Sequence, residues 1–214
     1  MKIITISREF GSGGRELGKR LAEQIGFEYY DKEIIMAIAE NKGMNEVYVE
    51  HMLENQPWKE IPLHFRSSLS GSRAIGYTRT DLLLEQKKVI EAIAGRGKDC
   101  VIVGRNADVL LQDYMPFKLF VCADMDTKIQ RCLERAGEHE KVSRKELERK
   151  IRSVDKSRGQ IRDVVTDVPW GDKYAYHLTV NTSGWNIKEL IPMVAEYAAA
   201  WFRRRENDTI IRPF

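Results

Sequence analysis

The sequence predicts a single α/β domain over residues 1–214, built on a mostly parallel sheet of about five strands with helices on both faces. Three observations lead to this prediction. Short apolar segments typical of strands alternate with longer segments of helical periodicity, the pattern of repeated β-α-β units. The length suits one core of this class plus an insertion better than two independent domains. The first strand also leads through a glycine-rich turn directly into an amphipathic helix.

The first two elements are a strand and a helix. Residues from Lys2 to Ser7 alternate and are β-branched, so we predict a strand over Ile3–Ser7. From Arg15 onward, apolar side chains recur every four residues and form a stripe on one helical face. This stripe consists of Leu17, Leu21 and Ile25. Gly26 is placed to end the helix.

The remaining strands are short apolar segments spaced along the chain. They are predicted at Phe27–Tyr30, Cys100–Gly104, Phe117–Cys122 and His177–Asn181. Helical patterns lie between them, over 31–55 with a second helix starting near Asn45, and from Asp81 to Ala94.

Two further helices complete the predicted fold. Ser143 and Glu146 form a capping box, which opens a long helix. A last helix contains Pro192, which either kinks it or lies in its first turn. The segment over 56–80 breaks the alternation, because it mixes proline, serine and glycine with arginines. A connection of this length is either a substrate-covering insertion or a surface loop.

The glycine-rich turn at Gly11–Gly14 predicts a phosphate-binding loop. Glycines let the backbone turn sharply and approach a ligand, and the start of the following helix attracts an anion. The strict P-loop pattern is not met, since Gly14 stands at the lysine position and the cation comes one residue later, as Arg15. Arg8 stands for the first glycine and Glu16 for the Mg²⁺-binding serine or threonine. The alternative is a turn that only joins strand to helix.

A strand end offers the first of three arginine clusters, which sites of phosphoryl transfer require. Arg105 follows an apolar strand, at the edge where parallel sheets bind ligands, and Gly104 gives clearance. A guanidinium there can hold a phosphate with two parallel hydrogen bonds. The alternative partner of Arg105 is Asp108 on the following turn.

The other two clusters lie on predicted helices. Arg131 and Arg135 share one helix face with Lys128 nearby, and they either face a ligand or form a solvated surface. The long capped helix carries a set spaced three residues apart, namely Arg152, Asp155 and Arg158. These residues either form salt bridges along the helix or bind phosphates, with the carboxylate accepting hydrogen bonds from a base or ribose.

The composition argues against several classes of protein. A net charge of +3 is too small to indicate nucleic-acid binding, whereas the clustered arginines suit a small polyanion in a cleft. No apolar stretch approaches the ~18 residues that a membrane span needs. The three cysteines lack metal-like spacing, so we expect buried reduced thiols. With no signal-peptide pattern at the start, we expect a cytoplasmic protein.

Several of these segments together resemble the cytidylate kinase-like family, a branch of the P-loop nucleoside monophosphate kinases. The resemblance runs through ISREFGSGGRELGKRLAE, FEYYDKEII, VIVGRNADVLL, IRSVDKSRGQIRDVV and HLTVNTSG, with 56–80 matched least. It implies a three-layer P-loop NTPase fold with a helical insertion within 31–96 and a lid within 136–160, around Gly137–Lys141. The chain departs from the cytidylate kinase pattern where Asp31-Lys32-Glu33 replaces a D-[ST]-G-A segment.

The resemblance implies that the γ-phosphoryl group of ATP, with Mg²⁺, passes to a nucleoside monophosphate, CMP or dCMP first. The residues implied for the donor phosphates are Arg8, Gly11, Ser12, Gly13, Gly14, Arg15 and Glu16. Those implied for the acceptor are Asp31, Arg105, Asn106, Asp155 and Arg158. Catalytic charges would come from Arg15, Arg131, Arg135 and Arg152, with Arg8 as a second substitute for the loop lysine. Glu16 and Asp31 are the candidate metal ligands.

Other functions remain open at this point. The altered segment at Asp31 and the unmatched insertion favour a kinase of another small metabolite. The absent loop lysine favours a nucleotide-binding protein without turnover. We expect small-molecule nucleotides as partners, and neither nucleic acid nor membrane, because no cluster of base-stacking aromatic residues accompanies the arginines. The residues leave homo-oligomer formation undecided.

Overall fold

The chain folds around a sheet of five parallel strands, which confirms the predicted class. The computed structural model describes residues 1–54, 77–135 and 143–207. The strands in these ranges are β1 (Ile3–Arg8), β2 (Glu28–Tyr30), β3 (Cys100–Val103), β4 (Phe117–Cys122) and β5 (Leu178–Asn181). They pair in parallel in the order β2-β3-β1-β4-β5, so β1 lies at the centre between β3 and β4.

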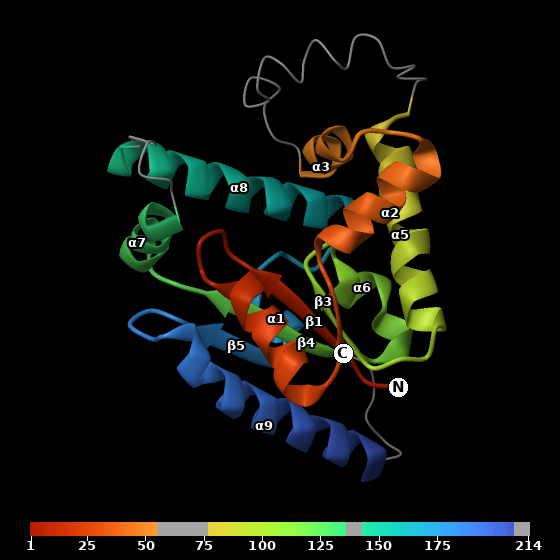
Figure 1. The fold of residues 1–214 in the computed structure, drawn as a ribbon, viewed down its shortest axis with the longest axis vertical. Coiled ribbons are helices and arrows are strands. Elements are labelled where there is room, and N and C mark those ends of the chain that lie inside the picture. Colours follow the sequence, from red (N-terminus) through yellow and green to blue (C-terminus); the bar gives the residue numbers. More distant parts are fainter. Residues whose placement is uncertain (55–76, 136–142, 208–214) are drawn as a thin grey trace.

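Helices cover both faces of the sheet and complete three layers (Figure 1). One face packs against α1 (Gly14–Ile25) and α9 (Ile187–Asn207). The other face packs against α2 (Lys32–Lys42), α3 (Glu46–Glu54), α5 (Arg79–Gly95) and α6 (Ala107–Leu110). A smaller apolar cluster joins α7 (Met125–Arg135) to α8 (Arg144–Val165). Short 3₁₀ turns lie at Gln112–Tyr114 and Lys173–Ala175.

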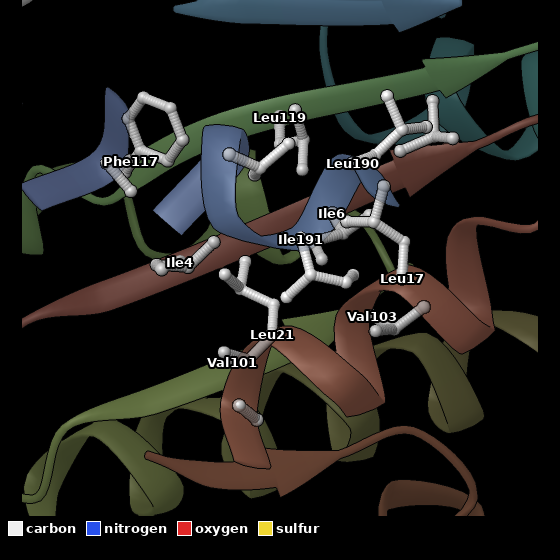
Figure 2. Close-up of a cluster of buried hydrophobic side chains, with 14 of the residues drawn as sticks. Ile4, Ile6, Leu17, Leu21, Val101, Val103, Phe117, Leu119, Leu190 and Ile191 are labelled. Atoms are coloured by element: carbon white, nitrogen blue, oxygen red, sulfur yellow. The ribbon is translucent and has the colours of Figure 1, made fainter. Parts of the chain in front are cut away.

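The alternating side chains of β1 divide the core into two halves. Ile4 and Ile6 pack against Leu17 and Leu21 of α1 and against residues of α9 (Figure 2), whereas Ile3 belongs to the opposite cluster. Each fully buried side chain of this size contributes about 1.5–3 kcal/mol relative to an exposed one. This packing fixes α1 on the sheet, and it thereby fixes the glycine-rich loop that joins β1 to α1.

Most predicted boundaries are confirmed, with local differences. The helical segment over 31–55 divides at Gly43, whose φ of 61° ends α2 before α3 begins. The capping box is present, since the Ser143 side chain accepts a hydrogen bond from the N–H of Glu146. Pro192 lies inside α9, beyond its first turn.

Other predictions meet the structure only in part. Of the segment at 56–80, residues 56–76 lie outside the described ranges, as does the lid centre at Gly137–Lys141. The three thiols are free, but Cys100 alone is fully buried, while Cys122 and Cys132 are partly buried. No helix in the described part of the chain is long and apolar enough to cross a membrane.

Candidate functional site

The glycine-rich loop between β1 and α1 has a backbone that only glycine fits. Gly11 and Gly13 have φ values of 78° and 84°, in the left-handed region. A Cβ on Gly13 would lie 2.5 Å from Cδ1 of Ile187, so the available space also requires glycine. Gly13 gives α1 no side-chain cap, and no side chain at this position competes with an anion for the first N–H groups of the helix. The loop therefore has glycine geometry at a helix start, a combination that can bind an anion.

Arg131 on α7 anchors this loop to the turn that follows β5. Its Nη1 donates to the carbonyl of Ser12 at 2.9 Å and to Oγ1 of Thr182 at 2.8 Å. Its Nη2 donates to the carbonyls of Thr182 and Trp185, both at 3.0 Å. The Thr182 hydroxyl also donates to the Ser12 carbonyl, at 2.7 Å. Movement of Arg131 toward a γ-phosphate would have to break these four bonds.

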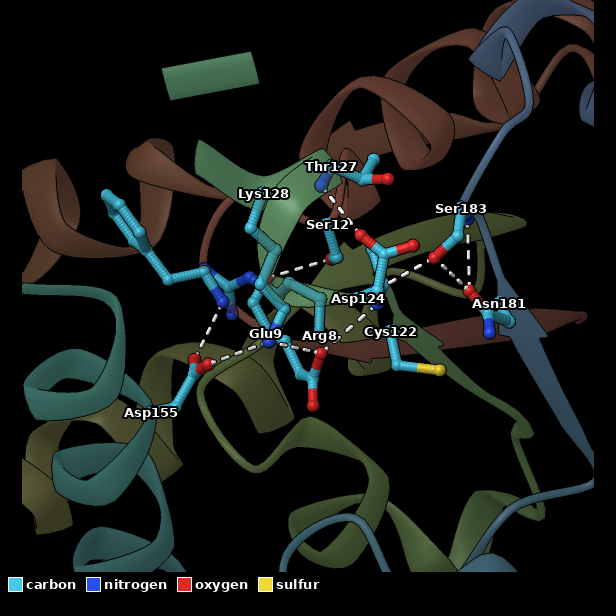
Figure 3. A network of polar contacts seen from close by, with 12 residues as sticks. Arg8, Glu9, Ser12, Cys122, Asp124, Thr127, Lys128, Asp155, Asn181 and Ser183 are labelled. Atoms are coloured by element: carbon cyan, nitrogen blue, oxygen red, sulfur yellow. Dashed lines mark hydrogen bonds and ion pairs between the residues drawn. The ribbon is translucent and has the colours of Figure 1, made fainter. Parts of the chain in front are cut away.

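A second polar network braces the first half of the loop (Figure 3). The buried Lys128 lies 2.6 Å from Oε2 of Glu9 and 3.5 Å from Oδ2 of Asp155. Oδ1 of Asp155 accepts a hydrogen bond from the N–H of Phe10 at 2.7 Å. Burial raises the pKa of Asp155, although this N–H bond, Arg158 and Lys128 all act to lower it. Asp155 thus faces the loop and holds it against α8.

Beside the loop lies a pocket of about 500 Å³ that includes space open to solvent. Three guanidinium-bearing residues from different elements line it, namely Arg8, Arg105 and Arg158. The other residues lining it are Ser7, Leu53, Gln86, Gly104, Asn106, Ile161 and Trp170. The pocket therefore combines concentrated positive charge with amide and apolar side chains, which suits an anionic small molecule that also carries a less polar part.

The turn after β3 gives this pocket its shape. Gly104, Arg105 and Asn106 have φ values of 75°, 62° and 53°, three left-handed residues in succession. Gln86 of α5 donates its Nε2–H to the carbonyl of Arg105 at 3.1 Å. Non-glycine residues in this region carry strain, and strained backbone is concentrated at functional sites.

The alternative partner considered for Arg105 is engaged elsewhere. Oδ2 of Asp108 lies 2.6 Å from Nη1 of Arg162 on α8, and both side chains are only 2% exposed. Asp108, the alternative partner of Arg105, is thus bound to Arg162, and Arg162 is a core residue.

The two candidate metal ligands are paired with arginines. Oδ2 of Asp31 lies 2.5 Å from Nε of Arg15, and its Oδ1 lies 3.9 Å from Nη2 of Arg8. Glu16 pairs with Arg20 at 2.9 Å and with Arg135 at 3.1 Å. Among the described residues, no group of three or more carboxylate, histidine or cysteine side chains is arranged to hold a metal ion.

The long helix α8 brings two of its three predicted site residues to the loop. Arg158 donates from Nη1 to the Arg8 carbonyl at 2.9 Å, and it pairs with Asp155 at 3.3 Å. Arg152 is exposed and donates to Glu148 at 2.8 Å, four residues earlier on the same helix.

Two residues of the site were not predicted by sequence reasoning. Lys128 stood out only as part of a basic helix face, and its burial depends on the distant Glu9 and Asp155. Gln86 lies on a helix without any motif, and its role follows from the position of the turn after β3. The polar Gln86 inside an otherwise apolar helical stripe is the signal that could have identified it.

Known proteins resemble this chain over most of its length. The model of the cytidylate kinase-like family matches residues 3–184. Cytidylate kinase of Haloarcula marismortui is 25% identical over 86% of this chain and 82% of its own length. Cytidylate kinase of Methanopyrus kandleri is 25% identical over 87% of this chain and 88% of its own length.

Solved structures share the fold. An uncharacterized protein from Eubacterium ventriosum has a TM-score of 0.68 at 25% identity, covering 93% of this chain and 99% of that one. A shikimate kinase from Bacteroides thetaiotaomicron has a TM-score of 0.55 at 14% identity, covering 92% and 98%. At that identity the second likeness concerns the fold alone.

Proposed function

The chain belongs to the cytidylate kinase-like family, and from this premise we propose that it transfers the γ-phosphoryl group of ATP to a nucleoside monophosphate, with CMP or dCMP as first candidates. The similarity to proteins named cytidylate kinase supports a phosphotransferase. Because these identities are near 25%, they do not identify the acceptor, and the side chains that line the pocket determine it.

One observation carries the proposal. The arginine pocket lies at the end of β1, where the glycine-rich loop begins, because Arg8 both ends β1 and lines the pocket. Phosphoryl transfer depends mainly on positioning and on neutralising charge around the moving group. A phosphate-binding loop beside three converging arginines supplies both.

The proposed roles follow from this placement. The N–H groups of Gly11–Gly14 and the start of α1 would hold the donor phosphates. Arg105 and Arg158 would hold the acceptor phosphate, each with two parallel N–H bonds. Asn106 and Gln86, whose amides can both donate and accept, would contact the sugar or base.

Mg²⁺ would supply charge neutralisation on the donor phosphates. It usually keeps several waters and binds substrate phosphates with only one or two carboxylates. Because Asp31 and Glu16 are both paired with arginines, neither is a preorganised ligand for the ion.

The proposed reaction needs no general base. An oxygen of the acceptor phosphate forms a bond to the γ-phosphorus, and the bond from that phosphorus to the β–γ bridging oxygen breaks. ADP leaves with the electron pair. The acceptor phosphate is already ionised near neutral pH, so no proton has to be removed from it before attack.

The first test is acceptor-dependent ADP release with Mg·ATP and a panel of CMP, dCMP, UMP, AMP and GMP. We expect turnover with a pyrimidine monophosphate and a loss of about 100-fold or more in Arg105→Ala, since a preorganised charge at the site is removed. Arg203→Ala on the exposed end of α9 is the matched control and should keep the activity. No turnover across the panel would exclude the cytidylate assignment.

A second candidate is a kinase of another small phosphorylatable metabolite. Asp31, which stands where cytidylate kinases carry a different segment, is buried and bound to Arg15. It is thus occupied by the chain itself, which favours an acceptor that differs from CMP. Retained ATP binding without turnover on an extended panel would instead favour a nucleotide-binding protein that lacks activity.

A further inference from the structure

We infer that Arg8 takes over the role of the lysine that the glycine-rich loop lacks, and that its guanidinium contacts the γ-phosphate during transfer. This inference rests on the proposed function, because it assigns a residue to the same reaction. The other cations near the start of α1 or the loop include Arg15, Lys128 and Arg131. The steric and ionic contacts of each distinguish Arg8 from them.

Arg8 fills the space around position 14, where the usual P-loop pattern places the lysine. A Cβ on Gly14 would lie 2.6 Å from Cβ and 3.1 Å from Cγ of Arg8. The stem of Arg8 therefore occupies the volume that a side chain at position 14 would need. Position 14, on the first turn of α1, therefore carries no cation, and the cation Arg8 stands at the end of β1 instead.

The guanidinium of Arg8 reaches from the end of β1 toward the pocket. It passes over Gly104, where any Cβ would overlap with Nη1 of Arg8. The side chain of Arg8 is only 10% exposed, and Arg8 lines the pocket together with Arg105 and Arg158. It thus extends from the donor loop to the proposed acceptor site, across which the phosphoryl group has to move.

The backbone of Arg8 is held in place by the sheet and by α8. Arg8 pairs with Val121 in the register of β1 and β4. Its carbonyl accepts a hydrogen bond from Nη1 of Arg158 at 2.9 Å. A charge on a fixed backbone needs little reorganisation when charge develops on the moving group, which is the condition for strong electrostatic stabilisation.

The other cations are engaged differently, and Arg131 is held by backbone carbonyls of the loop and of the turn after β5. The side chain of Arg15 is 50% exposed and lies 2.5 Å from Asp31, whereas Arg8 is 3.9 Å from the other oxygen of this carboxylate. Arg15 therefore makes the closer contact to Asp31 and does not line the pocket, whereas Arg8 does. Lys128 is held by Glu9 and Asp155, behind the first half of the loop.

The test compares Arg8→Met, which keeps an aliphatic stem and removes the charge, with Arg15→Met at the rival cation and with Lys19→Met, exposed on α1, as the matched control. Calorimetry would measure the affinity for ADP and for the β,γ-imido analogue of ATP. We expect Arg8→Met to lose about tenfold or more of the wild-type preference for the analogue, with ADP affinity little changed. Its kcat should fall about 100-fold or more, whereas Arg15→Met should lose less on both measures and Lys19→Met should keep the wild-type values.

The outcomes separate this inference from the proposed function. If Arg15→Met loses the preference and Arg8→Met keeps it, the role belongs to Arg15 and the inference is overturned. Unchanged preference and kcat in both variants would make Arg8 a structural residue. If the wild-type chain binds neither nucleotide, the proposed function itself fails.

A second substitution keeps the inference testable if Arg8→Met does not fold. Arg8→Lys retains a stem and a charge but cannot make two parallel bonds at the same reach. We expect it to melt near the wild-type temperature while kcat and the preference for the analogue both fall by about tenfold. Wild-type values on both measures would overturn the inference.

Discussion

The ion pair between Asp108 and Arg162 helps to position residues that line the pocket. Arg162 donates from Nη1 to Asp108, and from Nε to the carbonyl of Val168 at 3.1 Å. The second of these bonds fixes the chain two residues before Trp170, which lines the pocket. The other carboxylate oxygen of Asp108 is buried and has no hydrogen-bond partner among the described residues, so the pair depends on this one contact.

Removal of either side chain of the Asp108–Arg162 pair should therefore lower the free energy of unfolding. We expect Arg162→Met to lower the free energy of unfolding by about 3–5 kcal/mol, because the Asp108 carboxylate would stay buried without a counter-ion. Urea denaturation followed by circular dichroism measures the change. The exposed pair between Arg152 and Glu148 lies on the same helix, and Arg152→Met should cost no more than about 1 kcal/mol. Similar losses in both variants would contradict this account.

At the scale of elements, the glycine-rich loop depends on helices that follow it by more than a hundred residues. Arg131 joins the loop to the turn between β5 and α9, while Lys128, one turn earlier on α7, joins it to α8 through Asp155. The loop conformation is therefore a property of the way α7 packs, as much as of its own glycines.

Removal of the Arg131 anchor should loosen the loop. We expect Arg131→Met to lower the affinity for ATP by about tenfold or more, since the loop N–H groups would no longer be preorganised. Hydrogen exchange should show lost protection over residues 9–14. The matched control is Arg135→Met, which removes a surface contact to Glu16 on the same helix and should leave protection unchanged. If protection persists and only kcat falls, Arg131 acts on the phosphoryl group instead.

Local patterns were sufficient to predict the elements, because periodicity and caps act within a few residues. The capping box at Ser143 and the strand at Phe117–Cys122 are both confirmed. The division of the segment over 31–55 is confirmed as well, and it depends on Gly43, whose positive φ the sequence allowed but did not require. Partners across the fold could not be predicted in the same way, since spacing on one helix says nothing about what that helix faces.

The whole molecule brings the site together from distant parts of the chain. The bond between Arg158 and the Arg8 carbonyl spans 150 residues, and the bond between Asp155 and Phe10 spans 145. Parallel topology predicts that the ends of β1 and β3 meet at one edge of the sheet. It does not predict that Asp108, which follows β3, is bound by Arg162 of α8.

At the edge of the sheet farthest from β2, the imidazole of His177 makes the stability of the fold depend on pH. His177 precedes β5, and its Nδ1 accepts a hydrogen bond from the N–H of Lys118 at 2.9 Å. Its ring stacks on Phe117 and lies 4.7 Å from the ring of Trp201, measured between centroids. Burial, and secondarily the charge of Lys118, lowers the pKa of His177 to about 4.

The sign of the pH effect follows from this lowered pKa. The unfolded chain takes up a proton near pH 6.5, whereas folded His177 stays neutral down to about pH 4. The contribution of His177 to stability is therefore fully present above pH 6.5 and is lost as the pH falls toward 4. The loss is at most about 3 kcal/mol, because one pKa unit corresponds to ~1.4 kcal/mol.

Chemical denaturation at a series of pH values tests this prediction at the scale of the whole molecule. His177→Asn keeps an acceptor for Lys118 but does not titrate, so it should be less stable than wild type at pH 7 and should lose less stability between pH 6.5 and 4.5. Carboxylates titrate similarly in both proteins, and the difference between the two curves isolates the histidine. Parallel curves across this window would mean that His177 is protonated in the folded protein, which is incompatible with Nδ1 as an acceptor.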